Sequence, residues 1–366
     1  MLFRSFEATL RFWFDRGVVG FRIDVANALM KQEGLPDLAG FDQSADGSEH
    51  PHWDRDEVHE VYRHWRAVAD SYPEPRVFVA EAWVDKAERL ARYVRRHELH
   101  TAFNFNFLRA PWLARALRST IDETLAEHAA VGAPPTWVLS NHDVARHLSR
   151  YARRQTGNPT RSLDDLLGQP ADLAVGERRA RAAALLMLAL PGGAYVYQGE
   201  ELGLPEVEDL PVDVLADPTW ERSGHTLRGR DGCRVPIPWA GDKPPFGFSP
   251  DRAVAEPWLP QPPTWRDRTV AALDGDPDSI LELYRTALRL RRDHPALGDG
   301  TLRWLESPAG TLLFAREPGF ICAVNVSRAP MPLPEGVELL LASGPLSRRG
   351  QLPPDRAAWL AAELPG

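Results

Sequence analysis

Five short apolar runs, each followed by or ending in polar residues, alternate with stretches whose apolar residues recur at helical spacing. The runs lie at residues 18–25, 76–83, 101–107, 136–143 and 194–199. Buried strands of parallel sheets are nearly continuous apolar runs, whereas amphipathic helices follow a 3.6-residue period. The alternation predicts an α/β protein. Polar residues at the carboxyl ends of its strands are typical of a parallel barrel, whose site lies at that edge.

The pattern changes near the carboxyl end of the chain. Residues 201–274 form a Pro- and Trp-rich region without clear periodicity. Beyond it, short runs at 311–315 and 320–326 are separated by Pro and Gly, which predicts a small antiparallel β domain. We therefore expect the C-terminal portion of a (β/α)8 barrel over residues 1–298 and a small β domain over residues 299–366.

Composition excludes several classes of partner. The chain has 366 residues and a formal charge of −8, and its basic residues are scattered, which argues against nucleic acid. Cys233 and Cys322 match no metal or redox spacing and cannot form a disulfide framework, which favours a reducing compartment. We expect no bound metal. No run approaches a membrane span of about 20 apolar residues, and the opening residues are unlike a signal peptide. These features predict a cytoplasmic protein without membrane contact.

The first apolar run, V-V-G-F-R-I-D-V, ends in a pair of opposite charges. Side chains two apart on a strand point to the same face, so the Arg22 guanidinium is expected beside the Asp24 carboxylate. A neighbouring cation favours the ionised form of a carboxyl group, which makes Asp24 a candidate nucleophile. The alternative is a buried structural ion pair.

Three acids stand at the ends of predicted strands: Asp24, Glu81 and Asp143. Closure of a barrel directs them into one cavity, where burial and like-charge repulsion raise at least one pKa and supply a proton donor. Glu81 is the expected acid because its sequence neighbours are apolar. Retaining glycosidases use two carboxyl groups about 5 to 5.5 Å apart. His142 and Asp143 are candidates to hydrogen-bond sugar hydroxyls. The alternative for each acid is a strand-end salt bridge.

Three motifs resemble the second, third and fourth signature regions of the α-amylase superfamily. They are G-F-R-I-D-V at 20–25, V-A-E-A-W at 79–83 and S-N-H-D at 140–143. Two longer segments resemble the α-glucosidase and oligo-1,6-glucosidase branch: Y-Q-G-E-E-L-G at 197–203 and G-R-D-G-C-R-V-P-I-P-W at 229–239. The resemblance covers essentially the whole chain.

The resemblance implies a retaining α-glucosidase that hydrolyses terminal α-linked glucose from short oligosaccharides without a cofactor. It implies Asp24 as nucleophile, Glu81 as acid/base and Asp143 as stabiliser of the transition state. It further implies glucose contacts from Arg22 and His142, and contacts near the leaving sugar from Arg230 and Arg234. In this branch a Val after the nucleophile is associated with tolerance of 1,6 linkages, so Val25 favours isomaltose-type substrates.

The sequence also departs from the family pattern. The family barrel has eight strands, and only the last five are recognised here. The first signature region with its Asp and His, the second domain and the calcium loop of this branch have no counterpart. A five-stranded partial barrel leaves unpaired edges, which promote aggregation. We therefore expect an N-terminally truncated form that is poorly soluble, with reduced or no activity.

Two alternatives to hydrolysis follow from the same residues. The glycosyl intermediate can pass to another sugar, which is the reaction of a glucosyltransferase or a sucrose or maltose isomerase. The chain can also be a non-catalytic remnant that only binds sugar or a partner protein. The expected partner is a small carbohydrate, and the sequence predicts no particular oligomeric state.

Overall fold

The computed structural model describes residues 2–38, 50–157, 163–250 and 252–362. The chain divides into two compact units: residues 1–106 with 119–137, and residues 107–118 with 138–366. Three elements contribute residues to both units: helices α4 (Phe105–Arg109) and α5 (Ala114–Val131) and strand β4 (Thr136–Val138).

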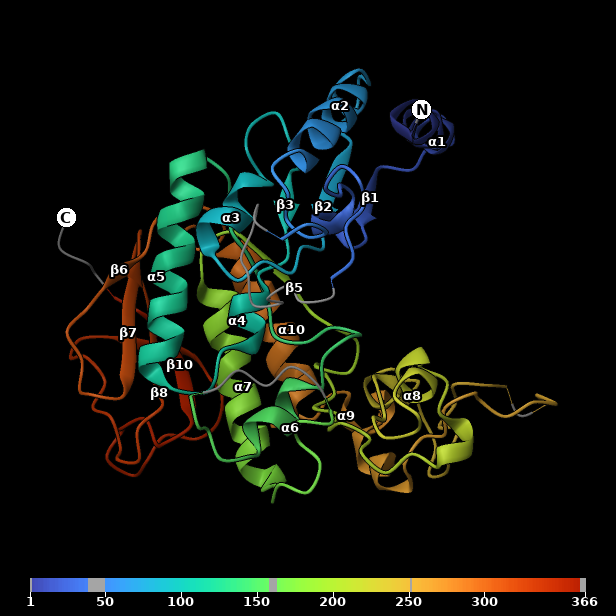
Figure 1. The fold of residues 1–366 in the computed structure, drawn as a ribbon. Helices are drawn as coiled ribbons and strands as arrows, with labels where there is room; N and C mark the ends of the chain where they lie inside the picture. Colours follow the sequence, from blue (N-terminus) through green and yellow to red (C-terminus); the bar gives the residue numbers. More distant parts are fainter. Residues whose placement is uncertain (1, 39–49, 158–162, 251, 363–366) are drawn as a thin grey trace. The chain divides into compact units, whose positions relative to one another are not determined.

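The first unit contains a parallel sheet and its helices (Figure 1). Its strands pair in the order β1-β2-β3, all parallel, as the sequence predicts. Gly20 lies opposite Val77, and a Cβ at position 20 would stand 2.2 Å from the Val77 carbonyl oxygen, so only glycine allows this pairing. The elements that lie wholly in this unit are α1 (Leu2–Phe14), β1 (Gly20–Ile23), α2 (Val58–Asp70), β2 (Val77–Ala80), α3 (Ala87–Arg92) and β3 (Thr101–Ala102).

Aromatic side chains fill the core of the first unit. Phe14 of α1 and Phe78 of β2 are buried with ring centroids 6.0 Å apart, and Tyr62 and Trp65 of α2 join the same cluster. Helix α2 presents these residues because its apolar positions recur along one face. The core therefore holds β1 and β2 in place, and the first group of candidate site residues lies on or just beyond these two strands.

The prediction of a third strand over residues 101–107 is wrong for the second half of that range. Strand β3 ends at Ala102, and Phe105 begins helix α4. Phe105 stacks on Trp83 with ring centroids 3.9 Å apart, and Asn104 donates from Nδ2 to Thr124 Oγ1 at 2.9 Å. Phe105 and Asn104 thus alternate in type because each makes its own long-range contact, and the regular strand does not extend beyond Ala102.

The second unit combines helices with an antiparallel sheet. Its last five strands pair in the order β6-β7-β8-β10-β9, which confirms the antiparallel sheet predicted near the carboxyl end. Its elements are α6 (His147–Tyr151), α7 (Leu173–Ala189), β5 (Gly193–Tyr195), α8 (Pro218–Arg222), α9 (Val270–Leu273), α10 (Ile280–Asp293), β6 (Arg303–Trp304), β7 (Thr311–Arg316), β8 (Phe320–Asn325), β9 (Glu338–Ala342) and β10 (Arg356–Ala361).

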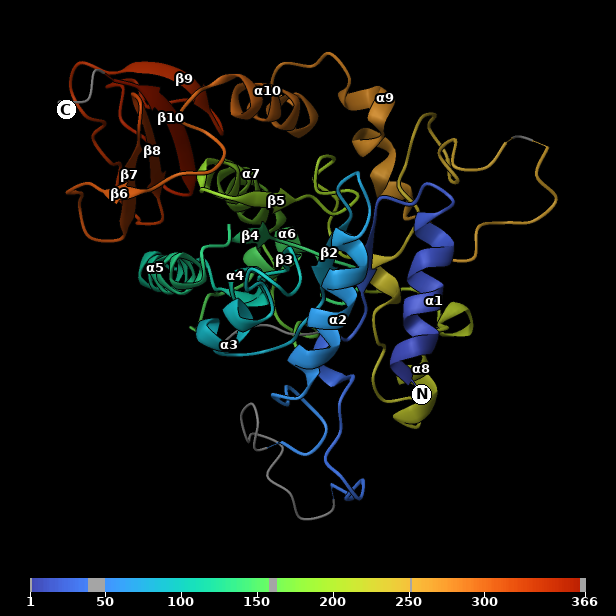
Figure 2. The ribbon, with the colours of Figure 1, turned by 90° about the horizontal axis from the view of Figure 1, so that it is seen from above.

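The antiparallel sheet packs against α7 (Figure 2). Trp359 of β10 is buried and donates its indole N–H to the Leu185 carbonyl at 3.0 Å. Across the part of the chain that the structure describes, no helix is both long enough and apolar enough to cross a membrane. The domain boundary at residue 298 stays a prediction.

Candidate active site

The first group of site residues lies at the carboxyl ends of β1 and β2. Arg22 contacts Asp24 through Nη1, 2.6 Å from Oδ1, and Glu81 through Nη2, 3.0 Å from Oε2. One planar guanidinium thus connects the two carboxylates, so their nearest oxygens lie within roughly 10 Å, the spacing that hydrolytic carboxyl pairs use. The Asp24 side chain is 72% exposed and therefore accessible to a ligand.

The setting of Glu81 differs from the apolar one that its sequence neighbours suggest. Glu81 is only 4% exposed, but three donors surround its carboxyl group. Oε2 accepts from the Val25 backbone N–H at 2.9 Å and from Arg22, and Oε1 accepts from the Trp83 indole N–H at 3.0 Å. Val25 and Trp83 lie in the loops that follow β1 and β2, and Arg22 lies in β1 itself, so the polar setting arises from tertiary structure.

Val25 adopts an unusual backbone conformation. Its φ of 45° and ψ of 47° lie in the left-handed region, which β-branched residues rarely enter. The following Ala26 N–H donates to the Glu81 carbonyl at 2.8 Å. The turn therefore directs two successive backbone donors at Glu81. Sequence reasoning missed this role, because nothing in the residue type Val signals a positive φ.

The second group gathers around Asp143, beyond the end of β4. Asn141 Oδ1 accepts from the backbone N–H groups of Asp143 and Val144, each at 2.9 Å, and this turn presents the Asp143 side chain. Asp143 Oδ1 accepts from Arg230 Nη1 at 2.6 Å and from Arg234 Nη2 at 3.3 Å. His142 Nε2 lies 3.4 Å from Oδ2. The second unit thus brings four of the predicted site residues together.

Asp217 is a site residue that the sequence reasoning missed. Its side chain is fully buried, and its Oδ2 accepts from Arg230 Nε at 2.5 Å and lies 3.7 Å from Arg234 Nη1. Burial raises the pKa of Asp217, but hydrogen bonds from Arg230 and Thr219 outweigh that effect and bring it down to about 2. The Asp217-Pro218 pair signals the N-terminal cap of α8, but it does not signal the contact with Arg230.

Buried Arg146 hydrogen-bonds to three other segments of the second unit. Its backbone N–H donates to Glu206 Oε2 at 2.8 Å, its Nη1 to the Gln198 carbonyl at 2.7 Å and its Nη2 to the Cys233 carbonyl at 2.9 Å. Burial raises the pKa of Glu206 to about 7 and that of Glu200 to about 8. Arg146 therefore fixes the loop that carries the two arginines of the Asp143 group.

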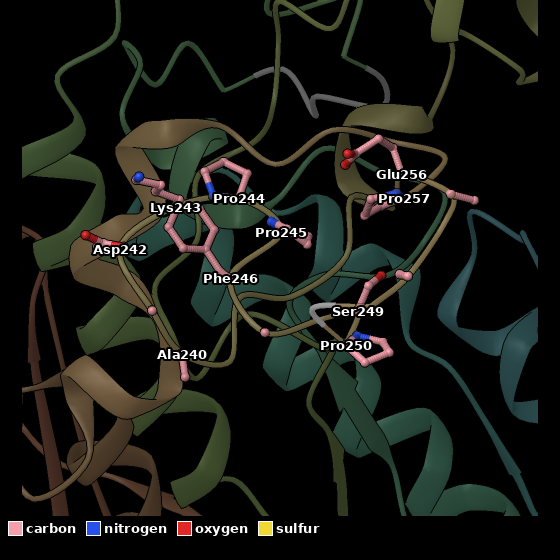
Figure 3. A pocket seen from close by; sticks show the side chains of 14 residues that line it. Ala240, Asp242, Lys243, Pro244, Pro245, Phe246, Ser249, Pro250, Glu256 and Pro257 are labelled. Carbon is pink, nitrogen blue, oxygen red and sulfur yellow. The ribbon is translucent and has the colours of Figure 1, made fainter.

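A hollow of about 520 Å³ lies elsewhere in the second unit, within residues 240–257. Figure 3 shows Asp242 and Glu256 at opposite sides of it, with Pro244, Pro245 and Phe246 between them. The described residues that line it include none of the predicted site residues. Nor do the residues that the structure describes contain a group of three or more His, Cys, Asp or Glu suited to hold a metal ion.

The predicted site residues therefore form two local groups, one in each unit. The first group supplies two carboxylates joined by one guanidinium, namely Asp24, Glu81 and Arg22. The second supplies one carboxylate held by two guanidiniums and flanked by an imidazole, namely Asp143, Arg230, Arg234 and His142. The first group thus contains a carboxylate pair of the kind that glycosidases use.

Sequence comparisons point to one family. A family model described as the catalytic domain of alpha amylase matches residues 2–300. A protein of Rhizobium meliloti described as a probable alpha-glucosidase is 31% identical over 343 residues, covering 87% of this chain and 57% of its own length. An oligo-1,6-glucosidase of Parageobacillus thermoglucosidasius is 28% identical over 334 residues, covering 81% and 54%. The chain spans about half the length of the curated relatives it matches.

Solved structures show the same fold. The alpha-glucosyl transfer enzyme XgtA superposes with a TM-score of 0.78 at 27% identity, covering 98% of this chain and 67% of its own. The trehalulose synthase MutB from Pseudomonas mesoacidophila MX-45 also superposes with a TM-score of 0.78, at 24% identity, covering 98% and 68%. The likeness to MutB shows the fold alone.

Proposed function

This chain belongs to the alpha-amylase family, and from that premise we propose that it carries the residues of a retaining α-glucosidase acting on terminal α-linked glucose of short oligosaccharides. The observation that carries the proposal is the contact of one guanidinium, that of Arg22, with both Asp24 and Glu81. Two carboxyl groups within roughly 10 Å suit a glycosidase, and the signature motifs support the retaining mechanism, in which one carboxyl group attacks and the other transfers a proton. The similarity to curated α-glucosidases supports the same substrate class.

In the proposed reaction, exposed Asp24 attacks the anomeric carbon and forms a glycosyl ester. Glu81 gives its proton to the departing glycosidic oxygen as that bond breaks. Glu81 then removes a proton from water, and the hydroxide displaces Asp24 and restores its carboxylate. The net result is one glycosidic bond hydrolysed, with the α configuration retained.

The roles proposed for the Asp143 group are those that the signature motifs imply. Asp143 would stabilise the positive charge of the oxocarbenium-like transition state, His142 and Arg22 would bind glucose hydroxyls, and Arg230 and Arg234 would lie toward the leaving sugar. The order of the three signature motifs along the chain supports this assignment. We further propose that β1 to β5 correspond to the last five strands of the family barrel, and that the small β domain begins at residue 299.

Transfer to a second sugar is the alternative function. Its support is the similarity to XgtA, an alpha-glucosyl transfer enzyme, at 27% identity over nearly the whole chain. Both reactions share the glycosyl ester, and they differ only in whether water or a sugar hydroxyl accepts the glucosyl group. The cytoplasmic location and the preference for 1,6 linkages stay predictions.

Product analysis on maltose, isomaltose and sucrose tests the proposal. Hydrolysis releases glucose that is initially the α anomer, whereas isomeric disaccharides would favour transfer. Asp24→Asn should abolish either reaction, and Asp37→Asn, at an exposed carboxylate of the first unit, is the matched control. Absence of turnover together with absence of heat on calorimetric titration with an α-glucosidase inhibitor would contradict a glucose site. Heat without turnover would support the non-catalytic alternative.

A further inference from the structure

We propose that Trp83 is a positioning residue for Glu81, in that its indole N–H sets the orientation in which the carboxyl group transfers a proton. The inference rests on the proposed role of Glu81. It starts from a division of donors between the two carboxyl oxygens. Oε1 accepts from Trp83 Nε1 at 3.0 Å, whereas Oε2 accepts from the Val25 N–H at 2.9 Å and from Arg22 at 3.0 Å.

This division determines how the carboxyl group is turned. The terminal torsion of a Glu side chain has broad, weakly defined minima, so burial of Glu81 does not by itself fix the carboxyl plane. Donors on opposite oxygens do fix it. Val25 and Arg22 hold only Oε2, and rotation about that oxygen is stopped by the Trp83 indole. Trp83 thus supplies a contact that holds Oε1.

Trp83 is held at both its ring and its backbone. Its ring stacks on Phe105 with centroids 3.9 Å apart and planes inclined by 16°. Its backbone is clamped by the buried amide of Asn27, whose Nδ2 donates to the Trp83 carbonyl at 3.2 Å and whose Oδ1 accepts from the Trp83 N–H at 3.4 Å. The donor that faces Glu81 is therefore preorganised before any substrate binds.

A kinetic consequence separates positioning from general structural support. Proton donation matters most when the leaving group is a poor one, such as a sugar hydroxyl, and little when it is an acidic phenol. Loss of the indole N–H should therefore impair cleavage of disaccharides much more than cleavage of 2,4-dinitrophenyl α-glucoside. A purely structural defect would lower both rates to the same extent.

Trp83→Phe is the test variant because it keeps a ring to stack on Phe105 and removes only the donor. We expect kcat/KM for maltose or isomaltose to fall about tenfold to a hundredfold, and that for 2,4-dinitrophenyl α-glucoside to fall less than about threefold. Trp53→Phe makes the same chemical change at a Trp outside the Glu81 contacts and should leave both rates unchanged. Equal losses on the two substrates in Trp83→Phe would overturn the proposal.

An NMR measurement tests the contact between Trp83 and Glu81 without requiring catalytic turnover. In the full chain with ¹⁵N-labelled indoles, the resonance missing from Trp83→Phe identifies the Nε1–H of Trp83. We expect Glu81→Gln to shift that resonance and Trp53→Phe to leave it in place. An unshifted resonance would overturn the proposal. A shifted resonance in a wild-type chain that cleaves no glucoside would overturn the proposed function instead, while upholding the contact between Trp83 and Glu81.

Discussion

Arg230 donates from Nη1 to Asp143 at 2.6 Å. The opposite side of the same guanidinium, at Nε, is held by buried Asp217 at 2.5 Å. A planar guanidinium can bind two carboxylates in fixed directions at once, whereas a Lys ammonium is a single flexible point charge. Asp217 therefore sets where the positive charge beside Asp143 stands.

Arg230→Lys should lower kcat/KM on disaccharides about tenfold or more, because Lys cannot reproduce the two-sided contact with Asp143 and Asp217. Steady-state kinetics measures the loss. Arg222→Lys, at an exposed arginine of the second unit, serves as the control and should leave kcat/KM unchanged. An Arg230→Lys enzyme with wild-type kinetics would show that the contact with Asp143 has no functional role.

Asp217 should stabilise the fold in a pH-dependent way. Its pKa is lowered in the folded state from 3.8 to about 2, so its contribution is present above about pH 4 and is lost as the pH falls toward 2. The contribution should be roughly 2 kcal/mol. Urea unfolding at pH 6 and pH 2.5 measures it as the stability difference between wild type and Asp217→Asn. That difference should shrink at the lower pH, while Asp213→Asn, at an exposed site, should show little difference at either pH.

Glu200 should act with the opposite sign. Burial raises its pKa from 4.5 to about 8 in the folded state, so the folded protein binds this proton more tightly and loses stability as the pH rises from about 4.5 to 8. Glu200→Gln removes the ionisation and should remove on the order of 3 kcal/mol of that loss. Unfolding measured at pH 5 and pH 8 checks this. Parallel pH profiles for wild type and Glu200→Gln would contradict it, and Glu335→Gln, at an exposed carboxylate, should keep the wild-type profile.

The backbone of Val25 should be strained, and a suitable substitution should relieve that strain. Asn enters the left-handed region much more readily than a β-branched residue, so Val25→Asn should raise the free energy of unfolding by about 1 kcal/mol. The backbone donor to Glu81 is kept in this variant. Val19→Asn is the control, since Val19 is also exposed but is not among the residues with positive φ. Equal stabilities for the two variants would argue against strain at Val25.

Short runs of apolar residues in the sequence predicted some of the strands correctly. The apolar runs that became β1 and β2 were recognised because strands of parallel sheets are rich in apolar residues, although only Ile23 of β1 and Phe78 and Ala80 of β2 are buried. The strand predicted over residues 101–107 was too long, because alternating Phe and Asn occurs in strands but also where the individual side chains make unrelated contacts. Phe105 lies in α4 and stacks on Trp83, a contact that no period in the sequence encodes.

The site was predicted in its charged residues but not in what surrounds them. The Arg22 and Asp24 contact was expected from their two-residue spacing, and the structure has it at 2.6 Å, with Asp24 just beyond the end of β1. The donors on Glu81 come partly from the loop after β1, and Asp217 reaches Arg230 from a region without periodicity. These contacts join distant segments, so residue types alone could not reveal them.

Trapping of the glycosyl intermediate tests the central claim most directly. A 5-fluoro-α-glucosyl fluoride should form a slowly hydrolysed ester, which peptide mass spectrometry would place on Asp24 in wild type and not in Asp24→Asn. Glu81→Gln should retain the ability to be labelled at Asp24, because fluoride needs little acid assistance to leave. A label on any other carboxylate, or turnover of glucosides by Asp24→Asn at the wild-type rate, would contradict the account.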